Sequence, residues 1–184
     1  MNNEITSSVI GQLRQDKNLP DWWISNDIEI PFLDNDKLTI TFMELEPAED
    51  ETFVDEADRA LTNFLKLNID DRKSISALVH KNCIDFLDAI ESDEEDDPLR
   101  ALNDKNEIWN FVYPTEIFVT RRNRRDQNIY VSIDCDCEWE QEHGLQLVFR
   151  QGKKLTRISA RDGHVTEADA YDKPDEADEL LSLF

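Results

Sequence analysis

The stretch Ile129-Tyr130-Val131-Ser132-Ile133-Asp134-Cys135-Asp136-Cys137-Glu138-Trp139 decides the fold of this chain. Its odd positions are apolar, and its even positions are mostly polar. Alternation of this kind is typical of a β-strand with one buried face, because successive side chains point to opposite faces of a sheet. The stretch predicts a long strand whose odd-numbered side chains, Cys135 and Cys137 included, face the core.

Further alternating runs flank this strand on both sides. A run around Ile117 precedes it across the polar residues 121–126, which we expect to form a hairpin connection. A run at 145–149 follows it, and turn residues at 151–153 lead to a last run at 155–160. The sequence predicts an antiparallel meander of three or four strands.

The N-terminal part predicts a second β-unit. Residues 28–33 and 37–42 alternate on either side of Asp34-Asn35-Asp36, a turn signal. We expect a hairpin over residues 28–42, with Leu38, Ile40 and Phe42 on one face.

Between the two β-units the apolar period changes to that of a helix. The spacing predicts one helix over 53–67, with Thr52 and Asp55 as its N-terminal capping box, and a second from Asp70 or Asp71 to about Ile90. A short helix is expected within 99–112. The predicted fold class is α+β, an antiparallel β-sheet, made of the N-terminal hairpin and the C-terminal meander, packed against two or three helices.

The expected domain organisation is simple. Residues 1–165 are predicted to form a single α+β domain, a size that supports one core. Residues 166–184 form an acidic C-terminal tail that is compatible with a docking helix at 175–183.

The charge of the chain limits its partners. There are 42 Asp and Glu against 20 Lys and Arg, a formal net charge of −22 at pH 7. Such a surface repels phosphate backbones and anionic lipids, so we expect neither nucleic acid nor membrane as a partner. A partner selected by charge should be basic. The chain holds only 4 glycines and no glycine-rich phosphate-binding motif, and we predict no cofactor.

The compartment is predicted from the N-terminus and the cysteines. The first residues lack the basic start and long apolar run of a signal peptide, and no later stretch approaches the ~20 apolar residues of a membrane span. The three cysteines lack the paired spacing of a secreted disulfide framework. We expect a cytoplasmic protein with reduced thiols.

Two carboxylate arrays are the candidate partner-binding residues. The first is the block Asp93, Glu94, Glu95, Asp96 and Asp97. The second is the row Asp134, Asp136, Glu138, Glu140 and Glu142, which shares one strand face at intervals of roughly 6 to 7 Å if the strand continues unbroken. Such a row suits a basic protein surface or a hard cation such as Ca²⁺, and it also suits a solvated strand face.

Other residue types allow site hypotheses that their positions disfavour. Cys135, Cys137 and His143 are zinc-ligand types, but the thiols lie in phase with the buried positions. Glu140 and Glu142 beside His143 could serve as acid and base of a hydrolase, although residues 142–144 read more simply as a turn. We therefore assign no catalytic residue and no metal ligand.

Three more features allow a functional and a structural interpretation. Trp22, Trp23 and Trp109 could form a ligand platform, but packing in the core or its rim is more typical. The arginines of residues 121–125 suit an exposed hairpin tip that is compensated by the acidic row or contacts a protein. His80 and His164 are predicted to be surface residues.

The motif at Cys137-Glu138-Trp139-Glu140-Gln141-Glu142-His143-Gly144-Leu145 resembles the C-x-W-x-x-E-H-G-L core of a family of uncharacterised bacterial domains. The resemblance extends to residues 22–23, 30–32, 57–65 and 109–119. Members of that family occur in settings similar to those of polymorphic-toxin immunity proteins, and the family supplies no catalytic residues to transfer.

The leading hypothesis is a non-catalytic protein that acts by protein contact, as an immunity protein that neutralises a basic toxin such as a nuclease. The alternatives are a metal-dependent hydrolase that uses Glu140, Glu142 and His143, and an accessory housekeeping domain.

Overall fold

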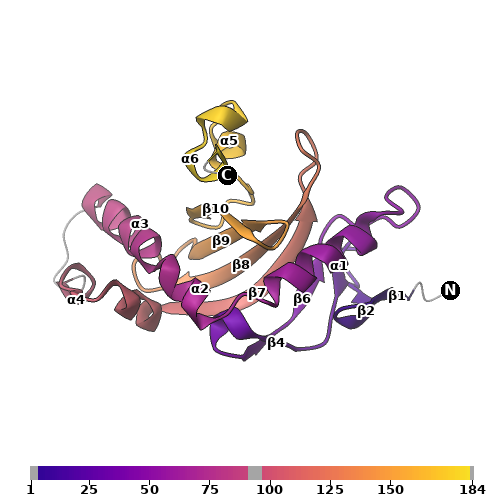
Figure 1. Ribbon diagram of the computed structural model, residues 1–184, viewed down its shortest axis with the longest axis horizontal. Helices are drawn as coiled ribbons and strands as arrows, with labels where there is room; N and C mark the ends of the chain where they lie inside the picture. The colour runs from indigo at the N-terminus through magenta and orange to yellow at the C-terminus, as the bar shows by residue number, and fades with distance from the viewer. Residues whose placement is uncertain (1–3, 91–96, 183–184) are drawn as a thin grey trace.

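The computed structural model describes residues 4–90 and 97–182, and its centre is an eight-stranded sheet (Figure 1). The strand order is β1-β2-β3-β6-β7-β8-β9-β10. The strands of the first half are β1 (Ile5–Ser7), β2 (Gly11–Gln15), β3 (Trp23–Ile24) and β6 (Ile40–Phe42). Those of the second half are β7 (Val112–Arg121), β8 (Ile129–Cys137), β9 (Leu145–Arg150) and β10 (Lys154–Ser159). The α+β fold class is confirmed.

The predicted meander is present as four antiparallel strands, β7 to β10. Its core-facing side chains include Ile117, Val131, Ile133 and Leu147, all fully buried. Strand β7 begins at Val112, before the predicted run around Ile117. Pro114 therefore lies within the strand, next to a register shift between Pro114 and Glu116. A proline is tolerated there because a bulge releases it from the ladder of hydrogen bonds.

The predicted N-terminal hairpin is only half right. Strands β4 (Ile28–Ile30) and β5 (Asp36–Leu38) pair with each other in a separate two-stranded sheet, with the 3-10 helix η1 (Pro31–Leu33) between them. Strand β6 leaves this unit and lies between β3 and β7, antiparallel to the first and parallel to the second. Leu38 and Ile40 are therefore in different sheets. Because β6 and β7 are parallel, the chain between them must cross over the sheet, and the helices described next form this crossover connection.

The helices of the crossover depart from the predicted pair. Helix α1 (Phe53–Phe64) is preceded by Thr52, whose side chain bonds to Asp50 and makes no cap. The predicted second helix is two helices, α2 (Ile69–Ser74) and α3 (Ser76–Ala89), with a break at Ile75. The capping box lies instead at the start of α2, where Asn68 and Asp71 bond reciprocally to backbone N–H groups.

The last part of the crossover also differs from the prediction. In place of one helix, the chain forms α4 (Asp97–Arg100) and the 3-10 helix η3 (Lys105–Phe111). These cover His80, which is buried, with its Nε2 3.2 Å from Lys105 Nζ. The expectation that His80 lies on the surface was wrong, because residues close in space and distant in sequence cover it.

The acidic tail is docked on the sheet and lies beyond β10, away from α1 (Figure 1). It forms the short helices α5 (Glu167–Ala170), η4 (Asp175–Ala177) and α6 (Glu179–Ser182), in place of one docking helix. The fully buried Asp178 accepts hydrogen bonds from the N–H groups of Ala168 and Leu181, which joins the pieces of the tail. Among the described residues, no helix has the length and apolar character needed to span a membrane.

Candidate functional site

The sheet has two unlike faces, and we call the one turned away from α1 the outer face. Its central side chains are those of β7, β8 and β9 that alternate with the core positions. They include Glu116, Phe118, Ser132, Asp134, Gln146 and Val148. In the register of the sheet, Phe118, Ser132 and Val148 form one row across the strands, and Glu116, Asp134 and Gln146 form the next. Polar and apolar groups therefore lie side by side on this face.

A groove of about 490 Å³ runs over these rows. Trp22 and Phe118 form an aromatic wall, with ring centroids 5.7 Å apart in an edge-to-face arrangement. The partly exposed Met43 extends the apolar surface, and the fully buried Val148 also lines the groove. A concave site with an apolar wall and a few polar groups is the usual form of a binding site.

Asp134 is the acidic group of the groove. Its side chain accepts a hydrogen bond of 3.3 Å from Ser132 Oγ, and it stands directly opposite Glu116 on β7. Burial raises the pKa of Asp134, Glu116 adds to the rise, and the hydrogen bond from Ser132 and the charge of Arg161 offset part of it. Within residues 4–90 and 97–182, no basic nitrogen forms an ion pair with it. The nearby Arg161 instead binds Asp136 at 3.1 Å.

The predicted row of five carboxylates does not continue along one strand, because β8 ends at Cys137. Asp136 and Glu138 are exposed, and Glu138 accepts a hydrogen bond of 2.7 Å from the hydroxyl of Tyr113. Glu140 turns inward and accepts hydrogen bonds from the N–H groups of Glu142 and His143, at 3.1 and 3.2 Å. It therefore serves as the cap of the turn between β8 and β9, while Glu142 is exposed.

A glycine makes this turn possible. Gly144 has φ +66°, and a Cβ atom there would lie 2.4 Å from the carbonyl oxygen of Cys135. The turn interpretation of residues 142–144 is confirmed, and the strand is forced to end before Glu140 and Glu142.

Most of the first carboxylate array, Asp93 to Asp96, lies outside the described residues. Asp97 is exposed at the start of α4. The two residues after it, Pro98 and Leu99, line a groove of about 360 Å³ together with Tyr113 and Glu138. The residues that follow the first array therefore lie near Tyr113 and Glu138.

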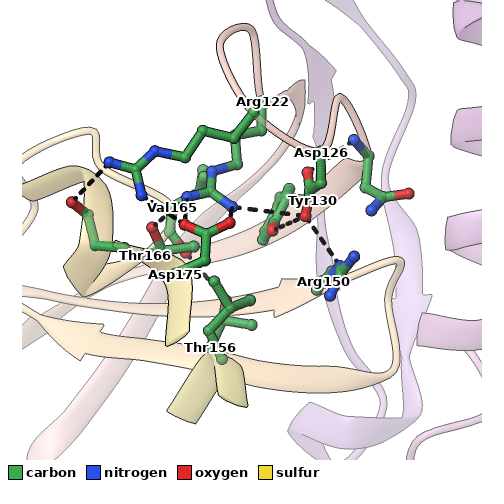
Figure 2. A network of polar contacts seen from close by, with 12 residues as sticks. Arg122, Asp126, Tyr130, Arg150, Thr156, Val165, Thr166 and Asp175 are labelled. Carbon is green, nitrogen blue, oxygen red and sulfur yellow. Dashed lines mark hydrogen bonds and ion pairs between the residues drawn. The ribbon is translucent and has the colours of Figure 1, made fainter. Parts of the chain in front are cut away.

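The arginine cluster of residues 121–125 pairs with acids that the sequence did not indicate. Arg121 binds Asp50 and Glu56. Arg122, only 4% exposed, lies between two carboxylates of the tail and binds each with two hydrogen bonds, Asp169 at 2.8 and 2.9 Å and Asp175 at 2.7 and 3.0 Å. Figure 2 shows Arg122 reaching Asp175 and Thr166, beside Asp126. Compensation by the acidic row was the wrong expectation, since the tail, Asp50 and the first turn of α1 supply the charges.

The cysteines do not form a reactive site. Cys135 and Cys137 are buried, as predicted, and burial raises the pKa of both thiols, that of Cys137 to about 11. Few thiolates are available at neutral pH under these conditions. In the part of the chain that the structure describes, no three His, Cys, Asp or Glu residues are grouped so that they could hold a metal ion.

Several residues of the outer face were missed from the sequence, above all Phe118, Glu116 and Gln146. The alternation that places Ile117 in the core also places its neighbours on the opposite face, so this signal was available. The contact of Trp22 with Phe118 had no such signal, because it depends on the order of β3, β6 and β7.

Comparison with known proteins adds a family and no function. A family model described as a domain of unknown function, DUF6985, matches residues 9–165. No curated protein and no solved structure matched the chain. The family match ends at Val165, directly before the docked tail.

Proposed function

The chain belongs to the DUF6985 family, and we propose that it is a non-catalytic protein that binds a basic protein through the outer face of its sheet. The chemistry of that face supports the proposal. Carboxylates and aromatic side chains alternate there, and both suit a partner rich in lysine and arginine.

The observation that carries the proposal is the pair of Tyr113 and Glu138. Tyr113 is 48% exposed although it is large and partly apolar, and its hydroxyl donates to the exposed carboxylate of Glu138. Exposed tyrosines are enriched in protein interfaces because they contribute much contact area at a low cost in conformational entropy. Asp136 lies opposite Tyr113 in the register of β7 and β8 and extends the acidic surface.

Net charge supports the same partner class. A chain of net charge −22 attracts a basic protein from a distance and accelerates their encounter. A toxin that degrades nucleic acid needs a positive surface around its active site, and an acidic protein can cover that surface. Neutralisation of such a toxin, as by an immunity protein, is the specific form of this function that we propose.

The test is capture of partners from the cells that produce the protein, with matched variants. We expect the wild type to retain one basic protein, and the double variant Tyr113→Ala with Glu138→Gln to retain at least about tenfold less of it. The control is the double variant Asp70→Asn with Asp85→Asn, which removes two exposed carboxylates from α2 and α3. It should retain the partner as the wild type does.

The immunity form needs a second measurement. The captured protein, expressed alone, should arrest growth, and co-expression of the wild type should restore it. Equal retention by all variants, or capture of no basic protein, contradicts the proposal. Capture of a harmless basic protein leaves binding in place and points to an accessory housekeeping role, as does a gene neighbourhood without a toxin gene.

A further inference from the structure

We infer that the groove over the outer face is a binding site for one arginine or lysine side chain of a basic protein partner, held between Asp134 and the aromatic wall of Trp22 and Phe118. This inference rests on the proposed function for the partner and names the part of the outer face that would recognise it. It follows from three features of the groove.

The first feature is that Asp134 stands apart from the other partly buried carboxylates near the groove. Asp126 is paired with Arg150 at 3.1 Å, and Asp169 with Arg122. Within the described part of the chain, the Asp134 side chain accepts a hydrogen bond from the hydroxyl of Ser132 alone, and it faces another carboxylate across the strand pair. The nearest cation, Arg161, lowers the pKa of Asp134 but forms its ion pair with Asp136, so a cation that arrives from outside can pair directly with the partly buried Asp134.

The second feature is that the arginines around the groove are already engaged. Arg122 is bound by Asp169 and Asp175, and Arg121 by Asp50 and Glu56. Arg161 donates to Asp136 and to the backbone carbonyl of His143. The nearby positive charges are therefore matched or exceeded by carboxylates, which favours a cationic occupant over an anionic one.

The third feature is the aromatic wall. A guanidinium or ammonium group over the face of a tryptophan or phenylalanine is attracted by its π-electrons, more strongly where water is excluded. The apolar stem of the same side chain can rest on the partly exposed Met43, which lines the groove. At about 490 Å³ the groove is large enough for one long side chain and part of its backbone.

The side-chain amide of Gln146, which lines the groove, is held in one orientation by hydrogen bonds. Gln146 Nε2 donates to Ser159 Oγ, Asp162 Oδ1 and the carbonyl oxygen of His164, at distances of 3.0 to 3.1 Å. These bonds use the donor side of the amide, so the atom that Gln146 offers to a ligand is its oxygen Oε1. An acceptor next to Asp134 in the register matches the N–H groups of an arginine or a lysine.

The test uses small probes and the full-length protein. The probe is the capped peptide acetyl-Gly-Arg-Gly-amide, and the matched neutral probe has citrulline in place of arginine. We expect the arginine peptide to shift the NMR signals of the Trp22 indole N–H and the Gln146 amide, with a dissociation constant of about 1 mM, which is typical of a single weak contact. The citrulline peptide should shift neither signal at the same concentrations.

The variants identify the site. Asp134→Asn should weaken binding of the arginine peptide at least about tenfold while the fold is preserved. Trp22→Ala should also weaken binding, as followed by the Gln146 amide signal, whereas Trp22→Phe keeps an aromatic ring and should bind nearly as the wild type does. Asp85→Asn, on α3, should bind as the wild type does. Equal binding of both peptides, no binding of either, or unchanged binding by Asp134→Asn overturns the inference.

These outcomes are separate from those of the proposed function. If a captured basic protein binds Asp134→Asn as tightly as the wild type, the groove inference fails and binding through Tyr113 and Glu138 stands. If the arginine peptide binds the groove and no basic protein is captured, the groove inference stands and the proposed function fails.

Discussion

At the scale of single residues, Asp134 is held in a place that disfavours its charge. Burial raises the pKa of Asp134 above the usual value of 3.8, so the protonated form is favoured by the folded state. A group with a raised folded pKa contributes stability below its unfolded pKa and loses that contribution as the pH rises through the folded pKa. At neutral pH the ionised carboxylate therefore lowers the stability of the fold.

The first prediction concerns the variant Asp134→Asn. An amide is neutral at every pH, and Ser132 Oγ can still donate to it. We expect the variant to have a higher free energy of unfolding than the wild type at pH 7, and the difference to shrink as the pH falls toward about 4. Urea unfolding between pH 4 and 8 measures it. Asp136→Asn, at an exposed carboxylate bound by Arg161, is the control and should show no gain at pH 7.

The second prediction concerns Arg122. Removal of one partner of a buried ion pair costs about 3 to 5 kcal/mol, but here the tail can leave the sheet and return Asp169 and Asp175 to water. The loss is therefore limited to the free energy that docks the tail. We expect Arg122→Ala to increase amide hydrogen exchange across residues 167–181 and to leave β7 to β9 protected. Arg124→Ala, at an exposed arginine of the same hairpin, should leave the tail protected.

At the scale of elements, the turn between β9 and β10 is fixed against helix α1. Gly152 in this turn has φ +65°, and a Cβ atom there would lie 2.0 Å from the carbonyl oxygen of Ala60 in α1. Gly163 has a similar φ of +77°, with open space around the position of its missing Cβ. Substitution of Gly163 therefore tests backbone strain alone, whereas substitution of Gly152 tests backbone strain together with a steric clash.

The third prediction compares these glycines. We expect Gly163→Ala to cost about 1 to 2 kcal/mol, the strain of a left-handed backbone. Gly152→Ala should cost clearly more, because the turn or the helix must also move apart. Thermal or urea unfolding of both variants measures the difference. A cost of Gly152→Ala no larger than that of Gly163→Ala contradicts the close contact of the turn with α1.

The docked tail gives a fourth prediction, on pH. The hydrogen bonds from Arg122 lower the pKa of Asp175 below 3.8. A lowered folded pKa stabilises the docked tail above the unfolded pKa, and this contribution is lost as the pH falls through the folded pKa. Hydrogen exchange of residues 167–181 should thus be slow at pH 5, relative to the intrinsic rate, and should lose its protection below about pH 3.8. Retained protection at pH 2 would show that Arg122 and Asp175 contribute little to docking.

The elements also show which parts of the fold were predictable from the sequence. The run at 129–139 predicted β8 and its buried face, because alternation is a local signal. The parallel pairing of Ile40 with Ile117 was not predictable from it, since periodicity does not say which distant strands pair. The partners of Arg122 were hidden for another reason: in a chain with 42 acids, many carboxylates match one arginine equally well. The candidate groove depends on both of these long-range choices, so Asp134 was its one residue predicted to bind a partner, while Trp22 was considered as a ligand platform and assigned to packing.

At the scale of the whole molecule, the helix-covered face of the sheet contributes to stability, and we propose that the outer face contributes to recognition. The helices of the crossover cover the core face of the sheet, and the tail covers only part of the other face, beside β10. The charged residues are spread over the entire surface, whereas the groove and Tyr113 lie on one face of the sheet. Long-range attraction and close contact should therefore respond differently to salt and to substitution.

The fifth prediction applies this to the association kinetics of the proposed complex with a basic protein. Salt screens the attraction between distant charges, so raising the ionic strength from 0.05 to 0.5 M should lower the association rate constant by about tenfold or more. Tyr113→Ala with Glu138→Gln should mainly raise the dissociation rate constant, because it removes close contacts. Asp70→Asn with Asp85→Asn removes two negative charges far from the outer face, against the one that Glu138→Gln removes. It should therefore lower the association rate constant slightly and leave the dissociation rate constant unchanged. Surface plasmon resonance at several salt concentrations measures both constants, and a dissociation rate raised equally by both double variants would mean that the partner does not bind at the outer face.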